Sequence, residues 1–288
     1  MTALEENLER LEEAIAEACR RAGRSRGEVE LMAVSKTYPA ATIADAAGLG
    51  LRLFGENRVQ EFAAKAADLA KLQSVVGGSI WAVGQGFSPD NGPAESTGAL
   101  APEVGLTGSF PSTFPVRAEV SSLIRVHLIG HLQSNKAARA AELFDAVDSV
   151  DSLRLAEKLN DAAGKLEKRL PVLIEVKLSP EESKAGLEPE SDEAARLLER
   201  LPDLSHLEAR GLMTIATWGV AEDLTRACFR SLREWRERWS LANPRLELEV
   251  LSMGMSGDFA LAIEEGATRI RIGTALFGKR APWAEAED

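Results

Sequence analysis

The stretch VELMAVSKTYPAATIADAAGLGLRLF, residues 29–54, contains a short apolar run, a helical stretch and a second short apolar run. The same alternation continues along the chain and predicts eight β/α pairs. An open doubly wound sheet can also hold eight parallel strands, but eight regular pairs over roughly 250 residues are typical of a closed (β/α)8 barrel. We therefore predict one α/β domain over residues 1–288, built as a (β/α)8 barrel.

The expected strands are the apolar runs, at residues 29–35, 51–54, 126–130, 144–150, 172–176, 207–213, 246–251 and 268–272. Helical patterns between them cover residues 39–47, 59–72, 152–163, 190–201, 221–241 and 257–265. Ser256 is the expected N-cap of the last of these helices. Leu and Ile at three- and four-residue steps predict an extra N-terminal helix over residues 3–22, ended by Gly23.

Residues 74–122 interrupt this pattern, because they are rich in Gly and Pro and poor in charge. A connection of this length is either an insertion without regular structure or a functional flap, and we favour a flexible insertion. It joins the second helix of the barrel to the third strand, at the end opposite the expected site. We therefore expect it not to be needed for ligand binding.

Composition excludes several classes of protein. With 34 basic and 45 acidic residues, the net charge of −11 disfavours nucleic acid and anionic membranes as partners. Cys19 and Cys228 are too few for a disulfide framework or a structural zinc site, and they fit a reducing compartment. The acidic start MTALEE does not resemble a signal peptide, and no apolar run is long enough to span a bilayer. We expect a cytoplasmic protein.

Polar side chains follow three of the expected strands. Lys36 ends the first strand and is either a surface residue or an amine held for Schiff-base chemistry. The motif GENRVQE, residues 55–61, either caps a helix or positions a ligand. His127 and His131 share a strand face, but without a neighbouring acidic or Cys ligand they indicate metal only weakly.

The segments LSMGMSGD, residues 251–258, and RIGTALFG, residues 271–278, follow the seventh and eighth strands. Barrels often bind phosphate in these two loops, at the N-terminus of a short helix. Gly273 permits close backbone approach, although glycines in barrel turns also occur for steric reasons. Strands one and eight are neighbours in a closed barrel, so Lys36 and this phosphate cradle can hold one ligand. A ligand with an aldehyde and a phosphate is pyridoxal 5′-phosphate.

Several of these motifs, in this order and spacing, resemble the pyridoxal phosphate homeostasis protein family. They are the segment around Lys36, residues 55–61, IGHLQSNK at 129–136, SVDSL at 149–153, ESKAG at 182–186, RGLMTI at 210–215 and residues 251–278. The resemblance implies a free-standing barrel of the alanine racemase N-terminal type. It also implies an intracellular protein that holds pyridoxal 5′-phosphate as an internal aldimine, buffers it, and affects amino- and keto-acid balance.

The resemblance also implies roles for individual residues. Lys36 matches the cofactor lysine, and Arg271 matches the arginine that faces the pyridine nitrogen. The remaining matches are Ser256, Gly273 and Thr274 in the phosphate cradle and Asn57 and His131 near the ring. The chain departs from the family at Val126, where Trp is usual, at Lys177, where Asn is usual, and in the insertion at 74–122.

Two classes of function fit these residues, a cofactor carrier and an amino-acid racemase. A racemase needs a base on each face of the cofactor, and the single tyrosine, Tyr38, lies too close to Lys36 to reach the opposite face. We therefore favour a carrier that is a monomer or weak dimer, with pyridoxal-phosphate-dependent apo-enzymes as recipients. A Schiff-base aldolase is disfavoured, because its lysine usually lies deeper in the barrel and on another strand.

Overall fold

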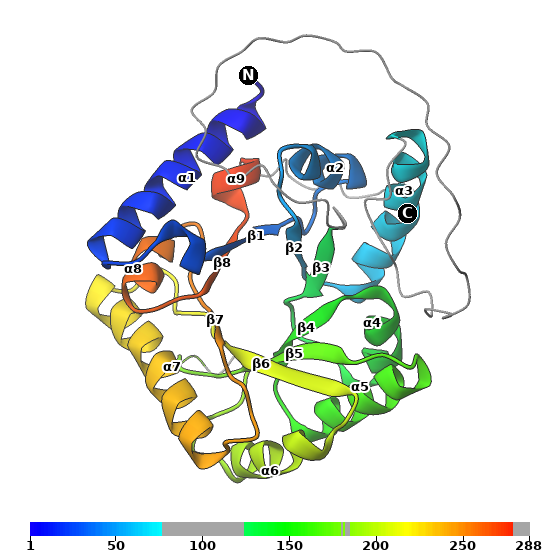
Figure 1. Cartoon of the computed structure of the whole chain (residues 1–288), viewed down its shortest axis with the longest axis vertical. Coiled ribbons are helices and arrows are strands. Elements are labelled where there is room, and N and C mark those ends of the chain that lie inside the picture. The colour runs from blue at the N-terminus through cyan, green and yellow to red at the C-terminus, as the bar shows by residue number, and fades with distance from the viewer. Residues whose placement is uncertain (77–123, 180, 182–184, 279–288) are drawn as a thin grey trace, which may run out of the picture.

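The computed structural model describes residues 1–76, 124–179, 181 and 185–278. Eight parallel strands close into a barrel in the order β1-β2-β3-β4-β5-β6-β7-β8, and helices surround it (Figure 1). The predicted (β/α)8 barrel is confirmed. Residues 77–122 of the predicted insertion lie outside the described residues, whereas residues 74–76 form the end of a helix.

The strands are β1 (Glu30–Val34), β2 (Leu53–Glu56), β3 (Arg125–Leu128), β4 (Ala146–Val150), β5 (Leu170–Glu175), β6 (Leu207–Met213), β7 (Val250–Ser252) and β8 (Arg269–Ile272). The helices are α1 (Ala3–Arg21), α2 (Ala40–Gly48), α3 (Val59–Val76), α4 (Ala137–Leu143), α5 (Leu153–Lys165), α6 (Asp192–Arg200), α7 (Glu222–Ala242), α8 (Phe259–Glu264) and α9 (Thr274–Phe277). Three single 3-10 turns, at Arg26–Glu28, Ser134–Lys136 and Leu201–Asp203, complete the described elements.

The extra N-terminal helix is present and lies along α8 and α9 (Figure 1). It begins at a capping box in which Thr2 and Glu5 bond each other's backbone N–H groups. Its apolar stripe, which includes Leu11 and Ile15, is buried in the main core. Asn7, one turn before Leu11 on the same face, donates to the carbonyl of Leu276 at 2.9 Å, which ties α1 to the last helix of the barrel.

Pairing of β1 with β8 closes the barrel. The register runs from Glu30 opposite Arg269 to Ala33 opposite Ile272. Alternate side chains point outward into the helix-packed core, which includes Ala33 and Ile272, or inward into a small apolar cluster that includes Met32. The C-terminal ends of β1 and β8 are therefore neighbours, as the phosphate-cradle hypothesis requires.

One predicted strand is much longer than the observed one. The pattern at residues 246–251 alternates buried Leu with exposed Glu, as a half-buried strand would, yet β7 contains only Val250–Ser252. Leu246 and Leu248 are buried in the core from irregular backbone. Alternating burial therefore does not require ladder hydrogen bonds. The other strand boundaries differ by at most two residues at either end, and residues 207–213 match β6 at both ends.

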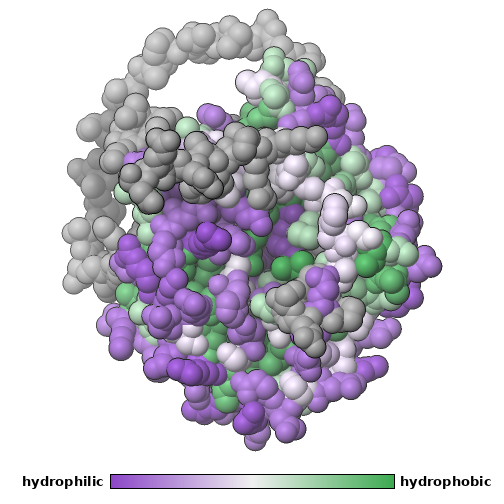
Figure 2. Space-filling model, turned by 180° about the vertical axis from the view of Figure 1, so that it is seen from behind, coloured by the Kyte–Doolittle hydropathy of each residue, from purple (hydrophilic) through white to green (hydrophobic). Residues whose placement is uncertain are grey.

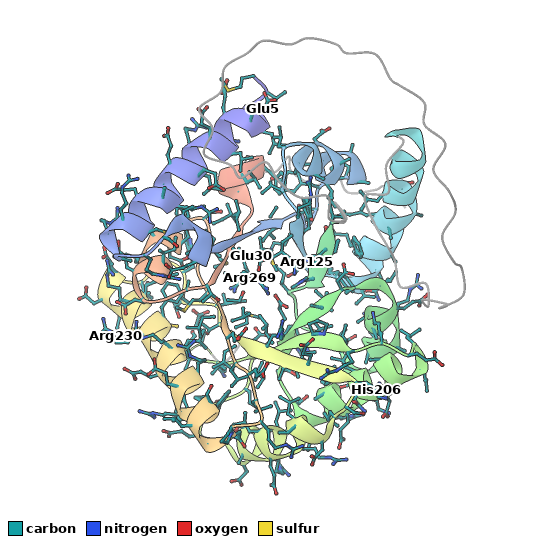
Figure 3. All side chains as sticks on the ribbon, in the orientation of Figure 1. Glu5, Glu30, Arg125, His206, Arg230 and Arg269 are labelled. Atoms are coloured by element: carbon teal, nitrogen blue, oxygen red, sulfur yellow. The ribbon has the colours of Figure 1, made fainter. Side chains whose placement is uncertain are left out.

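Charged side chains fill part of the barrel interior. Arg269 donates to Glu30 at 2.8 Å and to Asp148 at 3.1 Å, and His127 Nδ1 lies 3.1 Å from Asp148. Burial alone would raise the pKa of Asp148, but His127 and Arg269 hold it below its ordinary value. Glu30, Arg125 and Arg269 meet at the N-terminal ends of β1, β3 and β8, where Glu30 and Arg125 are partly exposed (Figure 3). His127 thus has a carboxylate partner on β4 that sequence spacing did not reveal.

The face shown in Figure 2 is mainly hydrophilic, with smaller hydrophobic patches. Within the described ranges, no helix is both long and apolar enough to cross a membrane. The same residues contain no group of three or more His, Cys, Asp or Glu side chains arranged to hold a metal ion.

Gly211 gives a direct test of barrel closure. It pairs with Val250 between β6 and β7, and a Cβ atom built at Gly211 would lie 2.0 Å from the Val250 carbonyl oxygen. Gly211→Ala therefore forces two backbones apart, and we expect it to lower the free energy of unfolding by about 3 kcal/mol or more. Gly27→Ala is the control, since nothing lies within 4 Å of its Cβ position. Equal denaturant midpoints for the two variants would contradict this account of the β6–β7 contact.

Candidate functional site

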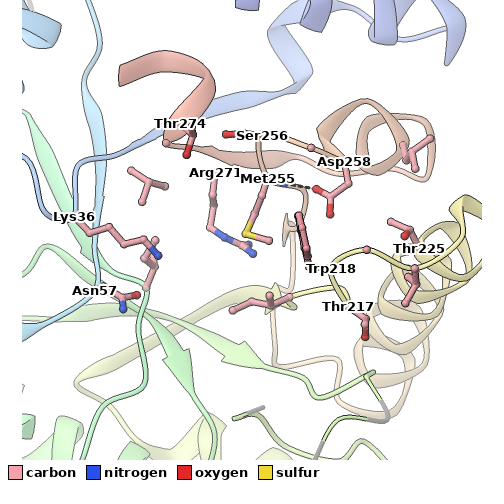
Figure 4. A pocket seen from close by; sticks show the side chains of 18 of the residues that line it. Lys36, Asn57, Thr217, Trp218, Thr225, Met255, Ser256, Asp258, Arg271 and Thr274 are labelled. Carbon is pink, nitrogen blue, oxygen red and sulfur yellow. Dashed lines mark hydrogen bonds between the residues drawn. The ribbon is translucent and has the colours of Figure 1, made fainter. Parts of the chain in front are cut away.

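A cavity of about 500 Å³ opens at the C-terminal ends of the strands (Figure 4). We call this end of the barrel the mouth. Six of the seven residues proposed from the sequence line the cavity: Lys36, Asn57, Ser256, Arg271, Gly273 and Thr274. They come from the ends of β1, β2, β7 and β8. Segments more than 200 residues apart in the chain are therefore brought to one site.

Ser35 fixes the backbone next to Lys36. Its N–H donates to the Gly55 carbonyl at 3.0 Å and its hydroxyl donates to Glu56 at 2.7 Å. Its carbonyl accepts from the Lys65 ammonium at 3.0 Å. On the other side of Lys36, Thr37 adopts a φ of 69°, and its N–H donates to Glu61 at 2.5 Å. Lys36 is thus a half-buried side chain on a backbone that neighbouring residues hold on both sides.

In the motif at residues 55–61, the two glutamates form structural ion pairs, whereas Asn57 faces the cavity. Lys65 Nζ lies 2.9 Å from Glu56 and 2.8 Å from Glu61, so both carboxylates have structural partners. Burial raises the pKa of Glu56, and the Lys65 charge opposes this rise. Asn57 instead lines the cavity. A Cβ at Gly130 would lie 2.3 Å from the Asn57 carbonyl, so the glycine permits this close approach.

Arg271 brings a buried positive charge to the cavity. Its Nη1 donates to the carbonyl and hydroxyl of Ser252 at 2.7 and 2.9 Å, and its Nη2 donates to the Thr214 carbonyl at 2.8 Å. These acceptors are neutral, and within the described part of the chain Arg271 forms no ion pair. Burial lowers the pKa of the guanidinium, while Asp148, Glu175 and Asp258 act in the opposite direction. Its charge is available to a ligand in the cavity.

The predicted cap at Ser256 is wrong. Helix α8 begins at Phe259 with Asp258 as its N-cap residue, because Met255 to Asp258 form a turn first. The Ser256 hydroxyl instead accepts from the N–H of Ala275, in the first turn of α9, at 3.2 Å. It thereby joins the loop after β7 to the one after β8. Ser256, Gly273 and Thr274 consequently lie on the same wall of the cavity.

The structure does not bring His131 into the cavity lining. Its side chain is exposed, and its Nδ1 lies 3.1 Å from Asp151 Oδ2. Tyr38 also has other partners: its hydroxyl donates to the Gly278 carbonyl at 2.9 Å, and its ring lies 5.0 Å from that of Phe277. Lys177 is 3.8 Å from Glu188 and does not line the cavity, and Val126 is fully buried in the core.

The alanine racemase N-terminal domain model matches residues 6–281. The chain is 36% identical over 280 residues to the pyridoxal phosphate homeostasis protein of Pseudomonas aeruginosa, with 97% of each chain covered. It is 34% identical over 282 residues to the protein of that name from Escherichia coli, covering 97% of this chain and 98% of the relative. The chain belongs to the pyridoxal phosphate homeostasis protein family.

Solved structures agree with this membership. The family member PipY of Synechococcus elongatus, in a structure with pyridoxal phosphate bound, is 38% identical, with a TM-score of 0.64 over 92% of this chain and all of that one. An alanine racemase of Clostridium difficile has a TM-score of 0.57 at 11% identity, covering 94% of this chain and 57% of the racemase. This second likeness concerns the fold alone.

Sequence reasoning missed Glu175, which ends β5. The side chain is buried, and its Oε2 has no hydrogen-bond partner among the described residues. Burial and the nearby charge of Asp151 raise the pKa of this carboxyl to about 7, and Arg271 opposes the rise. An acidic residue in an otherwise apolar strand, IEV at 174–176, was the available signal. Its burial depends on the barrel and could not be inferred from that signal.

Glu175→Gln tests this buried carboxyl through pH. Because the pKa is higher in the folded protein than in the unfolded chain, the folded protein binds the extra proton between about pH 4.5 and pH 7. The carboxyl of Glu175 therefore destabilises the wild-type fold increasingly as pH rises through this window. Since each pH unit corresponds to about 1.4 kcal/mol, the variant should gain about 2 kcal/mol over wild type between pH 5.5 and pH 8.

Denaturant unfolding at the two pH values measures this difference. The exposed Glu157, on α5, provides the control, and Glu157→Gln should follow wild type at both pH values. A stability difference between wild type and Glu175→Gln that stays constant with pH would contradict the raised pKa.

Proposed function

We propose that this protein binds pyridoxal 5′-phosphate in the cavity at the mouth, linked to Lys36, and serves as a carrier and buffer of the cofactor. One observation carries the proposal. The amine of Lys36, the buried guanidinium of Arg271 and the hydroxyls of the loops after β7 and β8 line the same cavity. The names of its relatives and the ligand of the Synechococcus structure support the same cofactor.

The residues fit the chemistry of this cofactor. The Lys36 amine can condense with the cofactor aldehyde to an imine, with loss of water. The hydroxyls of Ser256 and Thr274 can donate to a phosphate, and the N–H of Thr274, the first residue of α9, can add a backbone donor. Gly273 leaves room there, because a Cβ at this residue would meet only ordinary contacts, from 3.5 Å outward. Bound cofactor would supply an electrophilic carbon and an electron-withdrawing ring.

Arg271 weighs against transaminase chemistry. A guanidinium remains charged at all ordinary pH values, so opposite the pyridine nitrogen it donates a hydrogen bond without giving up its proton. A pyridine that stays unprotonated withdraws electrons weakly, which disfavours transamination. Asn57 lies on the Lys36 side of the cavity and can bond the ring substituents (Figure 4).

A racemase is the alternative function, and the position of Tyr38 weighs against it. Racemisation needs a second acid–base group facing Lys36 across the ligand. The Tyr38 hydroxyl is bonded to Gly278 and its ring packs on Phe277.

We infer that cofactor is released to pyridoxal-phosphate-dependent apo-enzymes, and that amino- and keto-acid balance responds to this supply.

Lys36→Ala tests the covalent link. An imine of pyridoxal phosphate absorbs visible light, so wild-type protein mixed with the cofactor should develop a visible band that withstands desalting. Without the Lys36 amine the variant should lose this band. Lys158→Ala, which removes an exposed lysine on α5, should keep it. An undiminished band in Lys36→Ala would mean that another lysine holds the cofactor.

Arg271→Gln tests the ring contact. Loss of a hydrogen bond from a charged donor costs about 1.5 to 3 kcal/mol, so cofactor affinity should fall about 10- to 100-fold. Arg230→Gln is the control, because Arg230 on α7 is exposed, bonds Glu265 and does not line the cavity. Titration of the folded variants with cofactor gives both affinities. Equal affinity in Arg271→Gln and wild type would refute the contact.

A further inference from the structure

Trp218 is an exposed aromatic residue at the cavity. Six large hydrophobic side chains are exposed among the described residues, and three of them, Trp218, Val220 and Leu224, lie within seven positions. Trp218 is 89% exposed and nevertheless lines the cavity together with Val220. An exposed indole contributes little to the stability of the fold, because its large apolar surface stays in contact with water. A role in ligand binding would explain why a tryptophan occupies this position.

The loop that carries Trp218 is anchored on the N-terminal side of the indole. Thr214 donates to the Val176 carbonyl at 2.8 Å, and the Thr217 and Ser179 hydroxyls are 2.7 Å apart. After Trp218, Gly219 adopts a φ of +76°, and α7 begins at Glu222. The indole itself has no hydrogen bond or ring contact with the residues that the structure describes. The backbone is therefore anchored, whereas the ring is left without a partner.

Trp218 faces the cavity from the side opposite Lys36. In the close view, Lys36 and Asn57 enter from one side, and Trp218 lies on the other, with Arg271 and Met255 between them (Figure 4). A planar ligand attached to Lys36 and bonded to Arg271 would thus lie within the same cavity as the indole. Apolar side chains such as Ile129 and Met255 also line the cavity, but among the described residues Trp218 is the one aromatic side chain in its lining.

We propose that Trp218 is a further cofactor-binding residue, whose indole covers the open face of the bound pyridoxal ring and slows its release. The proposal rests on the proposed function. An electron-rich indole stacks favourably on an electron-poor pyridine, and the contact also removes apolar surface of both rings from water. Covering the ring would leave the imine less accessible to water and to competing amines.

Trp218→Ala and Trp218→Phe test this contact, and Leu224→Ala is the matched control. Leu224 is also exposed and close in sequence, but it does not line the cavity. Each variant is loaded with pyridoxal phosphate and diluted, and the decay of the visible imine band gives the release rate. A lost stacking contact of about 1.4 kcal/mol corresponds to a tenfold change, so Trp218→Ala should release cofactor about tenfold faster. Trp218→Phe should stay within about threefold of wild type.

Tryptophan emission gives a second readout that does not depend on release. The chain has 5 Trp residues, and the one against the ring should be quenched most strongly by bound cofactor. The fractional quenching on loading should therefore be clearly smaller in Trp218→Phe than in wild type. Leu224→Ala should match wild type in both measurements.

The outcomes separate this inference from the proposed function. If wild type forms no visible band, the proposed function itself fails. If wild type forms the band and Trp218→Ala matches it in release rate and quenching, cofactor binding stands and the Trp218 contact is refuted. Equal acceleration in Trp218→Ala and Leu224→Ala would refute it as well, and would indicate an apolar surface that acts as a whole, as in protein docking.

Discussion

The pairing of β1 with β8 is the constraint on which the rest of the structure depends. Ala33 lies opposite Ile272, so the residues that follow these strands, Lys36 on one and Gly273 on the other, meet at the mouth. Closure of the barrel makes the first and last strands neighbours. The relation between lysine and cradle is therefore a property of the topology, and loops elsewhere can vary without disturbing it.

Closure brings the elements together, but buried ion pairs set the local geometry. Glu56 and Lys65 bind Ser35 through its hydroxyl and carbonyl, and Glu61 binds the backbone after Lys36. These three charged residues do not line the cavity. They act on the backbone just after β1, so the point from which the Lys36 side chain extends is fixed on both sides.

Much of this arrangement was readable from the sequence, because strand and helix periodicities are local. The eight strands, the N-terminal helix and the placement of Lys36 and Arg271 at strand ends follow from them. Partners distant in the chain were not readable. Lys65 belongs to a helix pattern, the Ser256 hydroxyl accepts from the N–H of Ala275, 19 residues further on, and Glu175 is buried only because the barrel encloses it. Leu246 and Leu248 give the sequence pattern of a strand, because buried and exposed side chains alternate there although the backbone pairs with no neighbouring strand.

The ionic interior below the site has an evolutionary consequence. Arg269 bonds both Glu30 and Asp148, and Asp148 also pairs with His127, so each charge depends on the others. Losing one member leaves an uncompensated buried charge, whereas exchanging the whole set for apolar residues of similar volume is often neutral or stabilising. A single substitution at any of these four positions is therefore expected to destabilise the fold, whereas a simultaneous exchange of all four is not. Over evolution, the four positions should therefore either stay unchanged or change together. This dependence of one substitution on the others is epistasis, and it arises because an unpaired charge is costly in the low-dielectric interior.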